Sequence, residues 1–167
     1  MPRRRSAQTS QALVNKAEGA HFEAVFIARC AVHGIWARKN ELAFKYLSGG
    51  KIMPIRADVD FCCIRKDGRV AMVDTKSFEG SHFTRSMLSE PQLAKCLNYA
   101  AYNVPAGMVV YLRETGHVFF YPIARIAHSV ARARFDYDNG IDLGPRFAFN
   151  PAILFLEPQL MAGSSDA

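Results

Sequence analysis

The sequence VDFCCIRKDGRVAMVDTK, from Val59 to Lys76, predicts a β-hairpin whose second strand is buried. Its first part, Val59–Arg65, contains valine, phenylalanine and isoleucine, which favour a strand. Its later part, Val70–Asp74, is apolar up to the final aspartate, as in a strand that is covered on both faces. The connecting Lys66–Arg69 contains Asp-Gly, which is the strongest short-range signal for a hairpin turn.

Helical patterns stand on either side of this hairpin. Apolar residues recur at three- and four-residue steps from about Ser10 to Val32, which predicts a first helix that stops near Gly34. A second helix is expected from near Pro91 to Tyr102, because proline is favoured in the first turn of a helix. A third helix is expected from Pro122 to Ala133 on the same ground.

Further extended segments are expected around the second helix. Buried strands are predicted at Gly107–Leu112 and Val118–Tyr121, and a short strand or arm at Lys51–Ile55. The segments without a clear period are the ambiguous Ile35–Tyr46, the polar loop from Ser77 to about Glu90, and the extended or irregular Phe147–Leu156. The alternation of strands and helices predicts an α/β domain with a central mixed β-sheet flanked by helices.

The length of 167 residues suits one domain. Residues 1–11 are polar and basic, so a flexible basic N-terminal arm is expected there, and residues 162–167 are expected to form a flexible tail. Residues 12–161 then form a single domain. No stretch is apolar for long enough to span a bilayer, and no apolar signal core follows the first arginines, so we expect a cytoplasmic protein with no membrane partner.

The four cysteines are Cys30, Cys62, Cys63 and Cys96, and they lack the paired spacing of a zinc site. Cys62 and Cys63 are adjacent, so they would point to opposite faces of a strand. We expect reduced and mostly buried thiols, as in a cytoplasmic protein.

The net charge of +6, from 21 basic and 15 acidic residues, favours an anionic partner. Lysine and arginine side chains neutralise the phosphates of a nucleic acid and release its counterions. The same charge also serves solubility alone, so charge by itself leaves both interpretations open.

Asp60, Asp74 and Lys76 are expected to meet at one edge of the sheet. Asp74 and Lys76 share a face if the second strand extends that far, and Asp60 starts the opposite arm of the hairpin. Hard divalent cations prefer carboxylate oxygen, and a bound cation polarises a phosphoryl oxygen and lowers the pKa of an attacking water. The lysine can stabilise that water or the developing charge.

Two alternatives stay open at this site. An aspartate and a lysine that flank the end of a strand are also common on protein surfaces. The register of a predicted strand is uncertain by a residue or two, so Asp58 is a rival of Asp60 and would share its face. The buried strand Val70–Val73 favours a functional site, because a charged pair at its end has no packing role.

These motifs resemble those of a known family. The order Asp60–Ile64, Gly68-Arg69 and Val73–Lys76 is similar to the central motif of the PD-(D/E)XK nucleases, and within them to the RecU-like Holliday junction resolvases. The resemblance covers Gly19–Pro122. Three further segments support the closer resemblance. Gly19–Glu23 is similar to a Gly-x-x-Phe/Leu-Glu motif of the family, and Phe83–Gln92 is similar to the segment after the catalytic lysine. Gly107–Val110 is similar to the core strand that follows.

The resemblance implies a restriction-endonuclease-like core and a Mg²⁺-dependent endodeoxyribonuclease, in which Mn²⁺ can substitute. Asp60 and Asp74 would ligate the metal, and Lys76 would act on the water. Glu23 would be an outer ligand of the metal or the water. Gln92 would position the lysine, a phosphate or the water. Residues 12–161 would then be the nuclease domain.

The sequence departs from the family pattern in three respects. Val59 stands where the family name has proline, and Asp74 stands where these resolvases commonly have glutamate. Glu90 stands where the family often has histidine or another polar residue. The insertion by which family resolvases enter the centre of a junction is not identifiable from the sequence.

Several further side chains are candidates for contacts with DNA. Basic side chains pair with phosphates, and hydroxyls donate hydrogen bonds to them. Arg125, Arg132 and Arg134 recur along the predicted third helix as a second basic surface, and Trp36 is expected in the core rather than as a platform for a base. The candidate DNA contacts are Arg3, Arg4, Arg5, Thr75, Ser77, His82, Thr84 and Arg85.

The resulting hypothesis is a homodimeric endonuclease that nicks branched DNA, here a four-way junction, on opposing strands. Dimerisation follows from the family resemblance and from the need for two cuts. One alternative is a restriction- or repair-type nuclease of the same superfamily that acts on duplex or flap DNA. Another is a non-catalytic basic DNA-binding accessory protein whose acidic cluster is structural.

Overall fold

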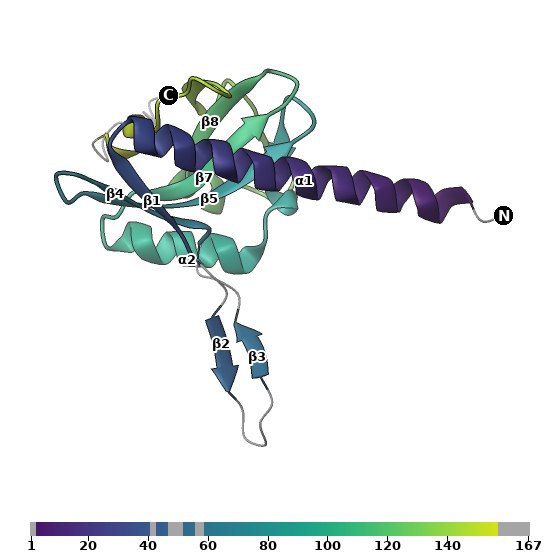
Figure 1. The fold of residues 1–167 in the computed structure, drawn as a ribbon, viewed down its shortest axis with the longest axis horizontal. Helices are drawn as coiled ribbons and strands as arrows, with labels where there is room; N and C mark the ends of the chain where they lie inside the picture. Colours follow the sequence, from purple (N-terminus) through teal and green to yellow (C-terminus); the bar gives the residue numbers. More distant parts are fainter. Residues whose placement is uncertain (1–2, 41–42, 47–51, 56–58, 157–167) are drawn as a thin grey trace.

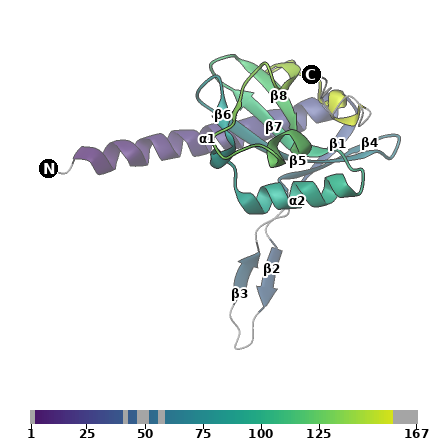
Figure 2. The same cartoon turned by 180° about the vertical axis from the view of Figure 1, so that it is seen from behind.

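A six-stranded mixed sheet with helices on both faces forms the body of the molecule (Figures 1 and 2). The computed structural model describes residues 3–40, 43–46, 52–55 and 59–156. This architecture confirms the predicted α/β class with a central mixed sheet. The elements in chain order are α1 (Arg3–Val32), β1 (Ile35–Lys39), β2 (Ala43–Tyr46), β3 (Ile52–Ile55), β4 (Phe61–Arg65), β5 (Val70–Phe78), β6 (Phe83–Thr84), the 3-10 helix η1 (Arg85–Met87), α2 (Glu90–Ala101), β7 (Ala106–Leu112), β8 (His117–Pro122), α3 (Ile123–Ala127), β9 (Arg134–Phe135), β10 (Ile141–Pro145) and the 3-10 helix η2 (Pro151–Phe155).

The strands of the main sheet lie in the order β1-β4-β5-β7-β8-β10. Every neighbouring pair is antiparallel except β5 and β7, which run parallel. A parallel pair needs a long crossover connection, and α2 supplies it between these two strands. The predicted hairpin is β4–β5, and its turn contains Gly68 with a φ of +84°, which glycine adopts without steric cost.

Two apolar cores cover the two faces of the sheet. The α1-side core joins Phe22 and Phe26 of α1 to Phe61, Val73 and other inward residues of the strands. The α2-side core joins Leu93 of α2 and residues of α3 to the opposite faces of the same strands. Strand alternation explains this division, because successive residues point to opposite faces. Cys63 lies in the first core and Cys62 packs against the second, as expected, and all four cysteines are free.

The long first helix lies across the sheet with its C-terminal half, while its N-terminal half extends past the sheet (Figures 1 and 2). It begins at Arg3, so residues 3–11 belong to a helix where a flexible arm was expected. No glycine or proline interrupts the sequence between Pro2 and Gly19, so nothing in it ends the helix early. The proposed tail, residues 162–167, lies outside the described residues.

The predicted extent of the third helix was wrong. The third helix ends at Ala127 instead of Ala133, and the hydroxyl of Ser129 donates a 2.6 Å hydrogen bond to the carbonyl of Ile126 just after it. A side chain that bonds to the backbone in this way competes with continued helix. Arg134 therefore lies on β9 and does not share a helix with Arg125.

The ambiguous segment after α1 forms β1 and then β2, which pairs with β3 in a separate two-stranded hairpin. This hairpin projects away from the main sheet in both views (Figures 1 and 2). Strand β10 at the far edge of the main sheet was not predicted, because its sequence contains glycine and proline. Among the described helices, none combines the length and the apolar character that a membrane span requires.

Candidate active site

Strand β5 carries two of the predicted residues on one face. It continues to Phe78 because it pairs with β7 in register from Met72 to Phe78. Met72 and Phe78 pack in the α2-side core, so alternation places Asp74 and Lys76 on that side of the sheet as well. The strand therefore extends as far as the sequence argument required.

Asp60 reaches the same place from the chain that precedes β4. Strand β4 begins only at Phe61, opposite Val73, so β5 has no β4 partner beyond that position. The carboxylate of Asp60 takes the place of this absent strand partner, because its Oδ2 accepts a 2.9 Å hydrogen bond from the backbone amide of Thr75. The hydroxyl of Thr75 adds a longer contact of 3.4 Å to the same oxygen. The site lies where the two strands separate.

Lys76 stands between the two carboxylates. Its Nζ lies 3.9 Å from Oδ2 of Asp60 and 3.8 Å from Oδ2 of Asp74. The side chain is 25% exposed, so the ammonium is only partly screened by solvent. Two carboxylates and one ammonium thus share one small region, as the spacing of the sequence predicted.

Asp74 is fully buried, and its two oxygens differ. Oδ1 accepts a 2.8 Å hydrogen bond from the backbone amide of Asp60, while Oδ2 is buried without a hydrogen-bond partner in the described part of the chain. Burial raises the pKa of Asp74 to about 6, against the opposing attraction of Lys76. A buried carboxylate oxygen without a donor is costly unless a cation approaches it.

The donor set fits a hard divalent cation. Asp60 and Asp74 offer carboxylate oxygens, and Oδ2 of Asp74, which accepts no hydrogen bond from the described residues, is the atom that a divalent cation would stabilise. Mg²⁺ keeps several waters and is commonly bound through only one or two carboxylates. Within the described residues, no group of three or more histidine, cysteine or acidic side chains is placed to hold a metal, so a site here would rest on these two aspartates.

Glu23 does not join the two aspartates. It lies on α1, on the other side of the sheet from Asp74, and its carboxylate forms an ion pair with Lys39 at the end of β1. Lys39 pairs in register with Phe61, next to Asp60, so this ion pair borders the site. A role for Glu23 as a metal or water ligand stays a prediction.

Gln92 lies in the first turn of α2, on the same side of the sheet as Asp74. Its side-chain oxygen accepts a 2.9 Å hydrogen bond from the hydroxyl of Ser89, the N-cap residue of the helix. Ser89 also accepts a bond from the Gln92 amide, which satisfies one free donor of the first turn. The side chain of Gln92 is therefore oriented by the helix cap, and a role toward the lysine or a phosphate stays a prediction.

The candidate DNA contacts lie on several different elements. Thr75 is buried and bonded to Asp60, and the hydroxyl of Ser77 is buried as well. His82 is exposed, and Arg85 forms an ion pair of 2.7 Å with Glu90. The structure places Arg3, Arg4 and Arg5 in the first turn of α1, and Thr84 on β6 with its hydroxyl 2.9 Å from that of Ser86.

One residue of the site was missed in the sequence. The backbone amide of Asn40 donates a 2.8 Å hydrogen bond to the carbonyl of Asp60, and its side-chain nitrogen donates another of 2.8 Å to the carbonyl of Val59. Asn40 therefore holds the chain that carries the Asp60 carboxylate. Nothing in the local sequence signals this contact, because Asn40 follows β1 and is 20 positions away.

Comparison with known proteins identifies the fold. No protein-family model matches the chain, and no curated protein matches it either. The structure is similar to that of Hjc from Archaeoglobus fulgidus, a Holliday junction resolvase from an archaeal hyperthermophile, with a TM-score of 0.53 and 13% sequence identity. The similar region covers 74% of this chain and 95% of that one. At this identity the similarity establishes a shared fold.

Proposed function

We propose that this chain is a Mg²⁺-dependent endodeoxyribonuclease of the PD-(D/E)XK superfamily that cuts four-way DNA junctions. The observation that carries the proposal is the meeting of Asp60, Asp74 and Lys76 where β4 and β5 separate. This arrangement occurs in a fold shared with a Holliday junction resolvase. The closer RecU-like assignment rests on the sequence motifs.

The chemistry of the site suits phosphodiester hydrolysis. Asp60 and Asp74 would hold the cation, which when bound polarises a phosphoryl oxygen and lowers the pKa of an attacking water. Lys76 would stabilise negative charge that develops on the phosphate, because its ammonium is already held beside both carboxylates. The backbone amide of Thr75 and Asn40 keep Asp60 in place, so the carboxylates need little rearrangement.

The proposed partner is branched DNA, and the proposed assembly is a homodimer. Resolution of a junction needs two cuts on opposing strands, and the described residues of one chain form one such site. The net charge of +6 favours a polyanion. The free cysteines agree with a reducing compartment, and we place the protein in the cytoplasm.

A comparison of substrates tests this proposal. Purified protein is incubated with a four-way junction, a flap and a linear duplex of matched sequence, with Mg²⁺, with Mn²⁺ and with a chelator. Paired nicks in the junction that require the metal support a resolvase. Faster cutting of the flap or the duplex would instead support a repair- or restriction-type nuclease. If none of the three is cut with either metal although the protein binds them, the accessory-protein alternative holds.

A further inference from the structure

Trp36 was expected in the core, but 60% of it is exposed. The residues on either side explain the difference. Ile35 and Ala37 pack in the α1-side core, so alternation turns Trp36 and Arg38 to the opposite face of β1. On that face α2 packs against β5 and β7, whereas β1 is the edge strand of the sheet. The indole is thus left open to solvent.

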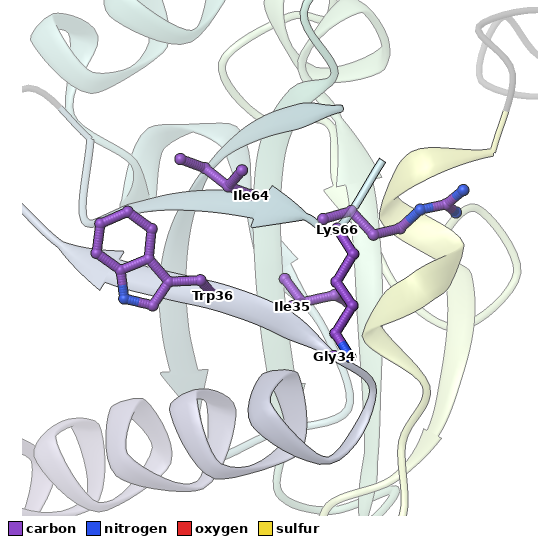
Figure 3. Close-up of a pocket in the computed structure, with 6 residues that line it drawn as sticks. Gly34, Ile35, Trp36, Ile64 and Lys66 are labelled. Atoms are coloured by element: carbon purple, nitrogen blue, oxygen red, sulfur yellow. The ribbon is translucent and has the colours of Figure 1, made fainter. Parts of the chain in front are cut away.

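The indole borders a hollow of about 420 Å³ on this face (Figure 3). Trp36 pairs in register with Ile64 of β4, and Gly34 and Lys66 close the other end of the hollow. The aliphatic part of Lys66 lies over Gly34, since a Cβ there would be 3.5 Å from Cε of the lysine. The floor is therefore apolar, with an ammonium group at its margin.

The charged residues that line this hollow, Arg65 and Lys66, are both basic. The guanidinium of Arg65 forms an ion pair with Asp67 and lies 5.8 Å from the centre of the Phe155 ring. Arg38 and Lys66 have no carboxylate partner among residues that the structure describes. This surface therefore consists of an open indole flanked by two cations that have no carboxylate partner in the described part of the chain.

We propose that the surface of Trp36, Ile64, Arg38 and Lys66 binds a DNA strand with unpaired bases. A base can stack on the exposed indole, while phosphates on either side contact the two cations. A second copy of this chain fits less well. A symmetric contact through this face would bring Arg38 and Lys66 of both copies together without compensating carboxylates.

The position of this surface relates it to the candidate active site. Strand β1 (Ile35–Lys39) continues from Trp36 to Lys39, and the backbone amide of the next residue, Asn40, donates a hydrogen bond to the carbonyl of Asp60. At about 3.4 Å for each residue of an extended strand, Trp36 lies about 14 Å along the strand from Asn40. A strand that leaves the carboxylates along β1 would therefore meet the indole within a few nucleotides.

The proposal shares with the proposed function only a DNA partner, and its test needs no cleavage. Trp36 is the sole tryptophan of the chain, so tryptophan emission reports on this surface alone. The wild-type protein with chelator is titrated with single-stranded oligothymidylate, and emission is followed together with the anisotropy of a labelled oligonucleotide. We expect saturable quenching at the concentration at which binding occurs. Quenching by a blunt duplex is expected to be weaker, because its bases are already stacked.

Variants separate this contact from a general loss of structure. Trp36→Ala is expected to weaken single-strand binding by about tenfold, within the range of base–aromatic stacking, and Trp36→Phe to retain most of it. Tyr102→Ala removes an aromatic side chain that is 84% exposed at the end of α2, and it is expected to bind as the wild type does. Arg38→Ala and Lys66→Ala are each expected to reduce the slope of log affinity against log salt for single-strand binding by about 0.7.

Three outcomes would overturn the inference. Emission that does not change at saturating oligonucleotide means that no base reaches the indole. If the Trp36→Ala and Trp36→Phe proteins both bind the oligonucleotide as tightly as the wild type, stacking on the indole does not contribute to binding. The third outcome is tryptophan emission that shifts with protein concentration in the absence of DNA, together with a dimer that Trp36→Ala dissociates. This result would show that the surface binds a second copy of the chain. Metal-dependent junction cleavage in any of these cases leaves the proposed function intact.

Discussion

The backbone amide of Asp60 donates a 2.8 Å hydrogen bond to Oδ1 of Asp74, and this bond joins the chain before β4 to the centre of β5. It fixes one oxygen of a fully buried carboxylate and leaves Oδ2 without a donor in the described residues. The Asp60 carboxylate in turn accepts from the Thr75 amide. The two aspartates therefore hold each other in place, and a change in either one acts on both.

Asp74→Asn is expected to abolish cleavage while DNA binding stays close to that of the wild type. Asparagine keeps the volume and can keep the bond from Asp60, but it lacks the charge that a divalent cation needs. Cleavage rates and the binding of a labelled junction, measured on the same preparation, check this. A variant that cuts at the wild-type rate would show that Asp74 is not part of the catalytic site.

The same substitution is expected to stabilise the metal-free fold above pH 6. The folded-state pKa of Asp74 is raised by burial to about 6 from 3.8, so the folded protein holds this proton more tightly. The stability that the protonated Asp74 contributes to the fold is fully present below pH 3.8 and is lost as pH rises through 6. This loss lowers the free energy of unfolding by at most about 3 kcal/mol. Asparagine does not ionise and avoids this loss.

Denaturant unfolding with chelator, at several pH values, measures this difference. Asp74→Asn should be more stable than the wild type at pH 8, and the two should converge near pH 4. Added Mg²⁺ should stabilise the wild type and leave the variant unchanged, because ligands stabilise only the state that binds them. If the wild type is more stable than the variant at pH 8 without metal, the ionised Asp74 carboxylate does not destabilise the metal-free fold, and this prediction is wrong.

Lys76→Ala is expected to abolish cleavage without unfolding the protein. The lysine is partly exposed and belongs to neither apolar core, so we expect its loss to leave the packing of β5 intact. Lys16→Ala removes the same charge from an exposed position on α1 and serves as the control. A thermal midpoint that collapses along with activity would favour a structural role for Lys76.

Glu23→Gln tests the family resemblance beyond the hairpin. If Glu23 is an outer ligand, the Mg²⁺ concentration for half-maximal cutting should rise, or the rate should fall by about tenfold or more. Stability should barely change, because glutamine keeps the volume and helix propensity of glutamate. Normal cutting at every Mg²⁺ concentration would reduce Glu23 to a helix residue.

Lys39→Met provides the matched control for Glu23. The structure pairs Lys39 with Glu23, so this variant releases the carboxylate without removing it. An active role of Glu23 at the metal predicts that Lys39→Met keeps or improves the response to Mg²⁺. Equal losses in Glu23→Gln and Lys39→Met would instead show that the ion pair itself is what the site needs.

Deletion of residues 1–8 tests the basic N-terminus. Each phosphate contact adds about 0.9 to the slope of log affinity against log salt for duplex DNA. If Arg3, Arg4 and Arg5 touch DNA, the deletion should make the slope less steep by about three units, as measured by junction binding at several salt concentrations. The same slope before and after deletion would mean that these arginines are only solvated.

The hairpin and its site were predictable from the sequence because their determinants are local. Asp-Gly sets the turn between β4 and β5, and the apolar run before Asp74 sets a buried strand. A strand alternates strictly, so the common face of Asp74 and Lys76 follows from their spacing alone. The spacing of the family motifs placed Asp60 beside them, and the distances to Lys76 agree.

What only the tertiary structure decided depends on contacts between distant segments. Glu23 pairs with Lys39 because α1 lies across the face of the sheet opposite Asp74, and helical periodicity does not reveal which face a helix covers. Asn40 holds Asp60 through bonds that form only once β1 lies beside β4. Trp36 is exposed because β1 became the edge strand, and an edge is a property of the order of strands in space. Local sequence specifies the period and the turns, whereas burial and pairing are set by the packing of elements that the sequence separates.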